Sequence, residues 1–395
     1  MNYIIDFFDL LLKPIDFTFY FNKTKSKITK KILYSNIEAP TLTLNNDVHI
    51  ICDIPNYMDV SLNTTHTNIK SISIPKYQGS MITLTNYENL DQYLKHHFNA
   101  KKRSQFKTYK KRLEKSFNIS YKVYYGNIDK TEYDRLFTKF PEIIKARFDT
   151  LRAEHYDLAV WDRYEQNAFS LINTKKACLF VIYDNNNPIS ISLTPVMGKV
   201  LYGFVRGFDV NYSKFYLGFT DILLQIEWCF ENNIDIFDLL KGFFPYKNKF
   251  TNGTYFFQNL FIYNTKSISS TVCAIFKALK LKGFYFTIKL LKLVHIDTLY
   301  HNYSTKKLDQ EKAKKFGENK TEFNYTIAPL TVTTGIEKYF EPIDINTEAY
   351  SFLKKPTYDT LYTSQEHIAK IEVYKETENS YIIKGVKTSY KITCA

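Results

Sequence analysis

Apolar and polar positions alternate in short segments through the centre of the chain, and this pattern predicts a row of strands. Alternation or short apolar runs predict strands over residues 119–125, 178–183, 189–196 and 200–205. Tight turns at Asp184 to Pro188 and at Met197 to Lys199 separate the last three. We therefore expect these three strands to form an antiparallel meander.

Helical periodicity surrounds this meander. Amphipathic helices are predicted over residues 131–145, with a break at Pro141, and over 155–173 and 219–231. Two more strands are predicted at 234–238 and 255–263. The expected order is strand, helix, helix, three strands, helix, strand, loop, strand.

The flanking regions differ in character from this centre. Residues 1–80 indicate a small strand-rich part, and 81–265 hold the predicted central domain. Residues 266–305 form a basic amphipathic helical segment that contains no acidic residue before Asp297 from Val272 onward. Such a segment either packs its apolar face on the protein or lies on an anionic membrane surface. Residues 306–395 indicate a charged linker and a strand-rich C-terminal appendix.

The amino-acid composition indicates which binding partners and which cellular compartment to expect. The 395 residues carry a net charge of +13, which favours anionic partners, although Lys, Asn, Tyr and Phe also reflect an AT-rich coding bias. Five scattered cysteines favour a reducing compartment. Neither a signal peptide nor a run of about 18 apolar residues is found, so we expect a cytoplasmic protein, with membrane association left open.

The segment from Lys199 to Tyr263 carries the candidate chemistry. A strand, a turn and a helix that begins near Gly218 would present free backbone N–H groups and a positive dipole end to a phosphate. Gly218 would permit a positive φ and a close approach of the backbone. The next strand ends at Asp238, and Lys241-Gly242 and Tyr246-Lys247 follow it.

This element order resembles the GNAT acyltransferase core. Asp238-Leu-Leu-Lys-Gly followed by Tyr246-Lys247 resembles the signature of the CelD/BcsL-type acetyltransferase branch, which is related to Fem-type aminoacyltransferases. A basic helix with Arg103 and Arg112 resembles the one that opens the domain in that branch. The resemblance covers roughly residues 80–265 and implies an α/β (α+β) fold with a mixed, largely antiparallel sheet flanked by helices.

The resemblance also implies an acyl-CoA-dependent N- or O-acyltransferase, with acetyl-CoA as the favoured co-substrate and no metal. The acceptor would be an amino sugar, a polysaccharide precursor or a lipid-linked intermediate. The diphosphate would bind the main-chain N–H groups of Tyr216, Leu217, Gly218, Phe219 and Thr220. The tyrosine-rich loop before this helix departs from the usual Gln/Arg-x-x-Gly-x-Gly/Ala pattern, which leaves the cofactor pose open.

The resemblance implies the remaining roles, which match the needs of acyl transfer. The backbone at Phe204, Val205 and Arg206 would stabilise the oxyanion. Asp238 or His155 would act as base, and Tyr246 would protonate the thiolate. Lys247 would hold a phosphate, and the acceptor would contact Arg147, Asp209 and Lys241. Each also has a structural alternative: Asp238 could cap a turn, and Arg206 could pair with Asp209.

Two other functions stay open. A Fem-like transferase would use aminoacyl-tRNA, but residues 1–95 look too short for the second GNAT-like half of such proteins. A non-catalytic binding module in envelope assembly is the third hypothesis. No zinc-ligand spacing, Walker A motif, dinucleotide fingerprint or Gly-x-Ser-x-Gly elbow is present, and the sequence does not indicate an oligomeric state.

Overall fold

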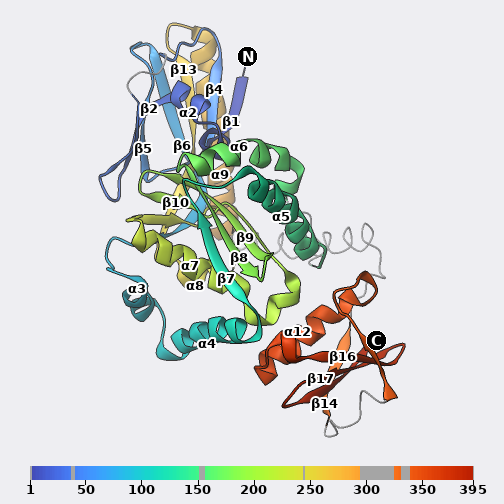
Figure 1. The fold of residues 1–395 in the computed structure, drawn as a ribbon. Coiled ribbons are helices and arrows are strands. Elements are labelled where there is room, and N and C mark those ends of the chain that lie inside the picture. The colour runs from blue at the N-terminus through green and yellow to red at the C-terminus, as the bar shows by residue number, and fades with distance from the viewer. Residues whose placement is uncertain are drawn as a thin grey trace.

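The computed structural model describes residues 2–36, 41–150, 156–242, 245–293, 324–330 and 339–394. Within these residues, ten strands form one large sheet in the order β1-β4-β13-β6-β12-β10-β9-β8-β7, with β11 paired to β9 (Figure 1). Two smaller sheets have the orders β3-β2-β5 and β14-β18-β17-β16-β15. In the large sheet β1 pairs with β4, and β10 with β12, in parallel; its other described pairs are antiparallel.

The central half of the large sheet is the predicted meander and its neighbours. Its strands are β7 (Ile119–Tyr124), β8 (Ala177–Asp184), β9 (Asn187–Met197), β10 (Val200–Tyr202), β11 (Val205–Phe208) and β12 (Ile236–Asp238). β8 and β9 are buried along nearly their whole length, as expected for strands covered on both faces. The predicted strand 200–205 is divided at Gly203 and Phe204: β10 pairs with both β9 and β12, whereas β11 pairs with β9 alone.

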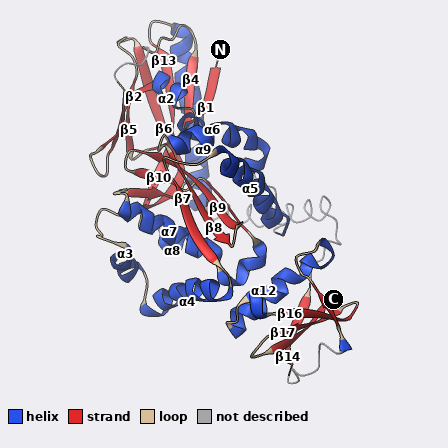
Figure 2. Cartoon of the chain, in the orientation of Figure 1, coloured by secondary structure: helices blue, strands red, loops and turns tan. Residues whose placement is uncertain are grey.

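Helices cover both faces of this half (Figure 2). One face packs against α5 (Lys130–Thr150) and α6 (Trp161–Asn173), which follows the short 3-10 helix η1 (Tyr156–Val160). The other packs against α3 (Leu90–His97), α4 (Ala100–Ser116) and α7 (Leu217–Glu231), with α8 (Pro245–Phe250) nearby. This is the mixed, largely antiparallel α/β sheet flanked by helices that the sequence predicts.

Helix α5 differs from its prediction because it runs through Pro141 without ending there. Its apolar side chains, among them Phe137, Phe140 and Ile144, are buried against the sheet. Burial of several such side chains at about 2 kcal/mol each outweighs the cost of one proline of about 3 kcal/mol.

The N-terminal part extends the same sheet. Its strands are β1 (Asn2–Asp6), β4 (Val48–Pro55) and β6 (Ile69–Thr83), joined by β13 (Gly253–Asn264) from beyond the central half. Helices α1 (Phe7–Leu12) and α2 (Pro14–Tyr20) and the small sheet of β2 (Phe21–Ser26), β3 (Ile32–Ser35) and β5 (Met58–Leu62) cover it. The expected boundary near residue 80 therefore falls inside β6, which pairs with both β13 and β12.

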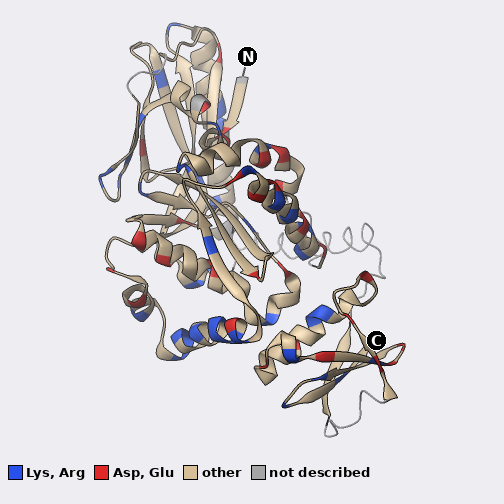
Figure 3. Ribbon diagram, viewed as in Figure 1, with Lys and Arg blue, Asp and Glu red and all other residues tan. Residues whose placement is uncertain are grey.

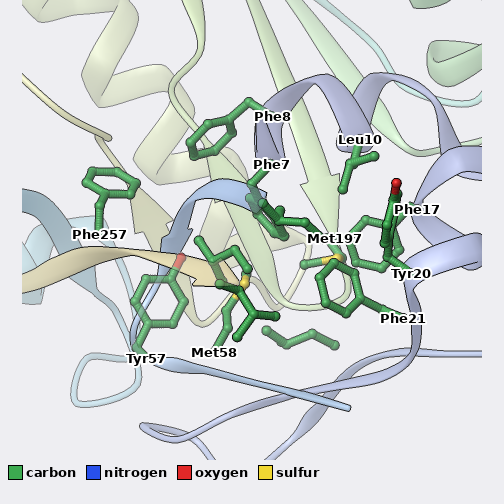
Figure 4. Packing of buried hydrophobic residues seen from close by; sticks show 14 of the residues in the cluster. Phe7, Phe8, Leu10, Phe17, Tyr20, Phe21, Tyr57, Met58, Met197 and Phe257 are labelled. Carbon is green, nitrogen blue, oxygen red and sulfur yellow. The ribbon is translucent and has the colours of Figure 1, made fainter. Parts of the chain in front are cut away.

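Aromatic and sulfur side chains join the two halves. One buried cluster contains Phe7 and Phe8 of α1, Phe17 of α2, Phe257 of β13 and Met197 at the end of β9 (Figure 4). Phe7 and Phe257 have no exposed surface. The core therefore continues from the N-terminal part into the central meander.

The C-terminal part is a separate sheet beside α4 (Figure 1). It consists of β14 (Tyr325–Leu330), β15 (Glu341–Ile343), β16 (Glu372–Thr377), β17 (Ser380–Lys384) and β18 (Ser389–Cys394), with η3 (Glu348–Leu353), α12 (Lys354–Ser364) and η4 (Ile368–Lys370). Tyr358 of α12 packs on Phe117 and on Tyr212 of η2 (Val210–Phe215). Most of the expected linker lies outside the described residues.

Candidate active site

Two neighbouring strands separate at the centre of the sheet. Tyr202 of β10 and Asp238 of β12 are their last parallel pair, and the N–H of Gly203 donates to the carbonyl of Asp238 over 2.7 Å. Beyond this point β11 pairs with β9, whereas Leu239 donates its N–H to Ser80 of β6 over 2.8 Å. The strands therefore diverge and leave a gap between Phe204 and Leu239.

A cavity of about 910 Å³ opens at this divergence. Its walls come from five parts of the chain, which extend in the sequence from Asp6 to Lys247. The lining includes Asp6, Phe8 and Asp9; Arg147, Asp157, Arg163 and Tyr164; Gly203, Phe204 and Arg206; Tyr216, Leu217, Gly218 and Phe219; and Leu239, Leu240, Lys241 and Lys247. Nine of the predicted site residues thus share one cavity: Arg147, Phe204, Arg206, Tyr216, Leu217, Gly218, Phe219, Lys241 and Lys247.

The N-terminus of α7 faces this cavity. The N–H groups of Phe219 and Thr220 both donate to the carbonyl of Tyr216, and that of Tyr216 donates to Ser213. Three of the five expected donors are therefore engaged. Within the described residues, the N–H groups of Leu217 and Gly218 have no protein acceptor, so these two can receive an anion.

The residue with the left-handed backbone is Tyr216, not Gly218. Tyr216 has φ 55° and ψ 46°, while Gly218 lies inside the first turn of the helix. Space is tight at Gly218, because a Cβ there would lie 3.3 Å from the Phe208 ring. The Tyr216 ring stacks on Tyr109 of α4 with 4.1 Å between centroids, which supports this backbone conformation.

Arg206 pairs with a residue of α7. Its Nε lies 2.6 Å from Oδ2 of Asp221, which is fully buried, and Ser192 and Gln225 complete the contact. The suggested pair with Asp209 is not formed, because Asp209 turns to cap η2 through the N–H of Asn211. Asp209 does not line the cavity, whereas Val205 buries its side chain in the core and its expected backbone role stays a prediction.

Lys247 is a buried cation at the cavity. Only 5% of its surface is exposed, and its ammonium donates to the carbonyl of Lys241. Burial lowers the pKa of Lys247 to about 8, with Asp238 opposing this and Arg206 adding to it. Lys241 instead pairs with Asp53 at 2.8 Å, and contacts with Asp53 raise the pKa of Lys241.

Asp238 shapes the turn behind the cavity. Its carboxylate accepts from the hydroxyls of Tyr57 and Tyr255, at 2.6 and 2.7 Å, and from the N–H of Leu240 at 2.8 Å. Burial raises the pKa of Asp238 to about 6, although all three donors act against the shift. The carboxylate is fully buried and does not line the cavity, which corrects the expectation that Asp238 contacts the acceptor.

The other two expected catalytic groups cannot be placed. His155 lies outside the described residues, and so does the side chain of Tyr246, although its backbone belongs to α8. Arg147 lines the cavity, and its guanidinium lies 4.2 Å from the centroid of the Phe208 ring. Among the residues described, no group of three or more His, Cys, Asp or Glu side chains could hold a metal ion.

Sequence reasoning missed the N-terminal wall of the cavity. Asp6 ends β1 and caps α1 through the N–H of Phe8 at 2.8 Å, while burial raises the pKa of Asp6. Asp9 pairs with Arg163 of α6 at 3.2 Å. Both acids interrupt an apolar segment in the sequence, and this was the only signal that they face a polar space.

Comparisons with known proteins agree with this fold. Residues 100–248 match the family model described as an acetyltransferase (GNAT) domain. That segment begins at α4 and ends in α8, so it contains the diverging strands and α7. The match of residues 100–248 to a GNAT acetyltransferase domain supports an acyltransferase enzyme and the use of acyl-CoA in general.

Several solved structures are similar at low identity. FemX is 11% identical, with a TM-score of 0.38 over 55% of this chain and 72% of that chain. L-PGS from Bacillus licheniformis is 10% identical, with a TM-score of 0.31 over 58% and 72%. The C-terminal domain (DUF2156) of a proposed lysylphosphatidylglycerol synthetase from Agrobacterium fabrum is 12% identical, with a TM-score of 0.35 over 60% and 72%. The search of curated proteins found no match.

Proposed function

We propose that the protein transfers an acyl group, with acetyl favoured, from acyl-CoA to an amine or hydroxyl of an amino sugar, a polysaccharide precursor or a lipid-linked acceptor. One observation carries the proposal: the cavity lies where β10 and β12 diverge, with the N–H groups of Leu217 and Gly218 on its wall. Leu239, Leu240, Lys241, Gly242 and Lys247, from the segment that resembles the CelD/BcsL-type branch, form another part of that wall.

The phosphates of CoA have donors and cations available. The N–H groups of Leu217 and Gly218 and the positive end of the α7 dipole would receive the diphosphate. Lys102 of α4 and Lys249 of α8 both lie 5.5 Å from the Phe219 ring centroid, beside the same helix end. Their mutual repulsion and burial lower the pKa of Lys102, and a bound phosphate would relieve that repulsion. Figure 3 shows the wider concentration of Lys and Arg along α4.

The thioester would lie in the gap between Phe204 and Leu239. Phe204 belongs to neither β10 nor β11, and in the described part of the chain its N–H has no protein acceptor. That N–H would donate to the oxyanion as the acceptor nitrogen bonds to the carbonyl carbon. Arg206 would add positive charge from the neighbouring position.

Two buried titratable groups would move the protons. The carbon–sulfur bond breaks as the intermediate collapses, and the Lys247 ammonium would give its proton to the departing thiolate. Asp6 would take the proton lost by the acceptor amine, since its raised pKa suits a general base. The net reaction moves one proton from the amine to the thiol. Lys247 is thus the proposed acid and Asp6 the proposed base.

Isothermal titration with CoA tests the proposal. Binding should be detectable at millimolar CoA, and pantetheine, which lacks the diphosphate, should bind at least about tenfold more weakly. Absence of CoA binding would remove the proposal. A tRNA gel shift that weakens steeply with salt, in the absence of CoA binding, would favour the aminoacyl-tRNA alternative instead.

A further inference from the structure

Helix α9 (Ile268–Leu293) presents two apolar faces. The inner face carries Ser270, Ala274 and Ala278, all buried. Ala274 and Ala278 pack on Val48 and Ile50 of β4 and on Ile74 and Phe261 of the neighbouring strands. Small residues let the helix lie close to the sheet, so this contact is complete without the opposite face.

The outer face is a continuous apolar stripe. Its residues recur at helical spacing and are all exposed, from 41% at Ile275 to 82% at Ile268. At about 100° per residue they share roughly a third of the helix circumference. The outer stripe consists of Ile268, Val272, Ile275, Phe276, Leu279, Phe286, Leu290 and Leu293.

Lysines lie on both sides of the outer stripe. Lys280 follows on one edge, and Lys282 and Lys289 on the other, and all three are exposed. No Asp or Glu occurs between Ile268 and Leu293. A helix with an exposed apolar stripe, flanking lysines and no acid is the pattern of a helix that lies in a membrane interface.

We propose that the outer stripe of α9 binds the surface of an anionic bilayer, with the helix axis in the membrane plane. The apolar side chains would enter the headgroup region by roughly 5–10 Å, and the lysines would contact lipid phosphates. Charge favours this occupant over a second copy of the chain, because a symmetric pair of outer stripes would bring lysines against lysines. No helix in the described residues is long and apolar enough to cross a bilayer, so the contact is peripheral. The inference does not depend on the proposed reaction.

Vesicle co-sedimentation of the full chain tests this inference. Vesicles of phosphatidylcholine mixed with phosphatidylglycerol should bind the protein, and phosphatidylcholine alone should bind it at least about tenfold more weakly. The double variant Leu279→Ser/Phe286→Ser should lose at least about tenfold in binding to the anionic vesicles, and so should Lys280→Gln/Lys282→Gln/Lys289→Gln. Val386→Ser, which removes an equally exposed side chain from the C-terminal sheet region, should bind as the unmodified protein does.

Thermal melts would show that each variant is folded before binding is compared. The inference is overturned if anionic vesicles do not bind the protein, or if the Leu279→Ser/Phe286→Ser variant binds them normally. It is also overturned if sedimentation shows a dimer that this variant abolishes while vesicles leave the protein in solution, because a second copy would then cover the outer stripe.

Discussion

Arg206 and Asp221 form an ion pair of 2.6 Å between β11 and α7. One member lines the cavity, and the other is buried behind it with Ser192 and Gln225. The pair therefore fixes the strand that would hold the thioester relative to the helix end that would hold the diphosphate.

Removing the charge of Asp221 should weaken the contact between β11 and α7. Asp221→Asn would remove the carboxylate charge that lies 2.6 Å from Nε of Arg206, whose side chain is only 17% exposed. We expect the free energy of unfolding to fall by about 3 kcal/mol and CoA affinity to fall with it. Urea denaturation and calorimetry measure both. Glu227→Gln on the exposed face of α7 is the matched control and should change neither; an unchanged Asp221→Asn protein would show that the pair is unimportant.

The Lys247 ammonium should lower the stability of the folded protein and raise its kcat. Lys247→Met removes a buried cation whose pKa is held near 8, so the variant should be more stable at pH 7 by roughly 1–3 kcal/mol. Its kcat should fall by at least about a hundredfold if the ammonium protonates the thiolate. Lys249→Met, from the exposed side of the same helix, should instead raise the KM for CoA while kcat and stability stay near their starting values.

The pH dependence of Lys247 gives a second readout. Because the folded pKa of Lys247 lies below its ordinary value, the unfolded chain holds this proton more tightly. Stability should therefore rise with pH between about 8 and the ordinary lysine value, and this rise should vanish in Lys247→Met. The kcat of the unmodified enzyme should decline above pH 8; a flat kcat profile would exclude Lys247 as the acid.

Gly218→Ala should weaken CoA binding more than it weakens the fold. The new Cβ would lie 3.3 Å from the Phe208 ring, a tight contact that a small shift relieves. The shift moves the first turn of α7, so we expect CoA affinity to fall by about tenfold and stability to change by less than about 1 kcal/mol. Titration and thermal melts separate the two effects. A loss of stability with normal CoA affinity would place the phosphates elsewhere.

Asp238 should make stability fall as pH rises in the acid range. Its folded pKa of about 6 lies above the ordinary value, so the folded state holds this proton longer than the unfolded chain does. Between about pH 4 and 6 the protein should therefore lose roughly 2–3 kcal/mol relative to Asp238→Asn, which lacks the titration. Parallel denaturation series at several pH values would measure this difference, and parallel curves for the two proteins would contradict it.

The sequence predicts this fold well where periodicity is strong. The meander and the helix after it stand out because β8 and β9 are short, apolar and bounded by tight turns. The division of the strand at Gly203 was not predictable, because it arises where the pairing with the distant strand β12 ends while the pairing with β9 resumes in β11. Pro141 did not end its helix, because burial of the apolar side chains of α5 outweighs the cost of the proline.

The candidate site could be predicted only in part. The helix end at Leu217 and Gly218 follows from local order along the chain, and the structure puts it at the cavity. Burial decides the roles of Asp238 and Lys247, and a sequence does not show which of two nearby polar residues faces a cavity. Asp6 lies some two hundred residues from Phe204, so only the folded sheet could bring the two together.

The fifteen-residue strand β6 has a practical consequence for dissection of this protein. Because its first part holds β13 and its last residues hold β12, a fragment cut at residue 81 would divide one ladder and strip another. Such a fragment would expose unpaired main-chain N–H and C=O groups along its strand edges and would be prone to aggregate. The transferase segment therefore shares one sheet with the N-terminal part, and the full chain is the unit to express.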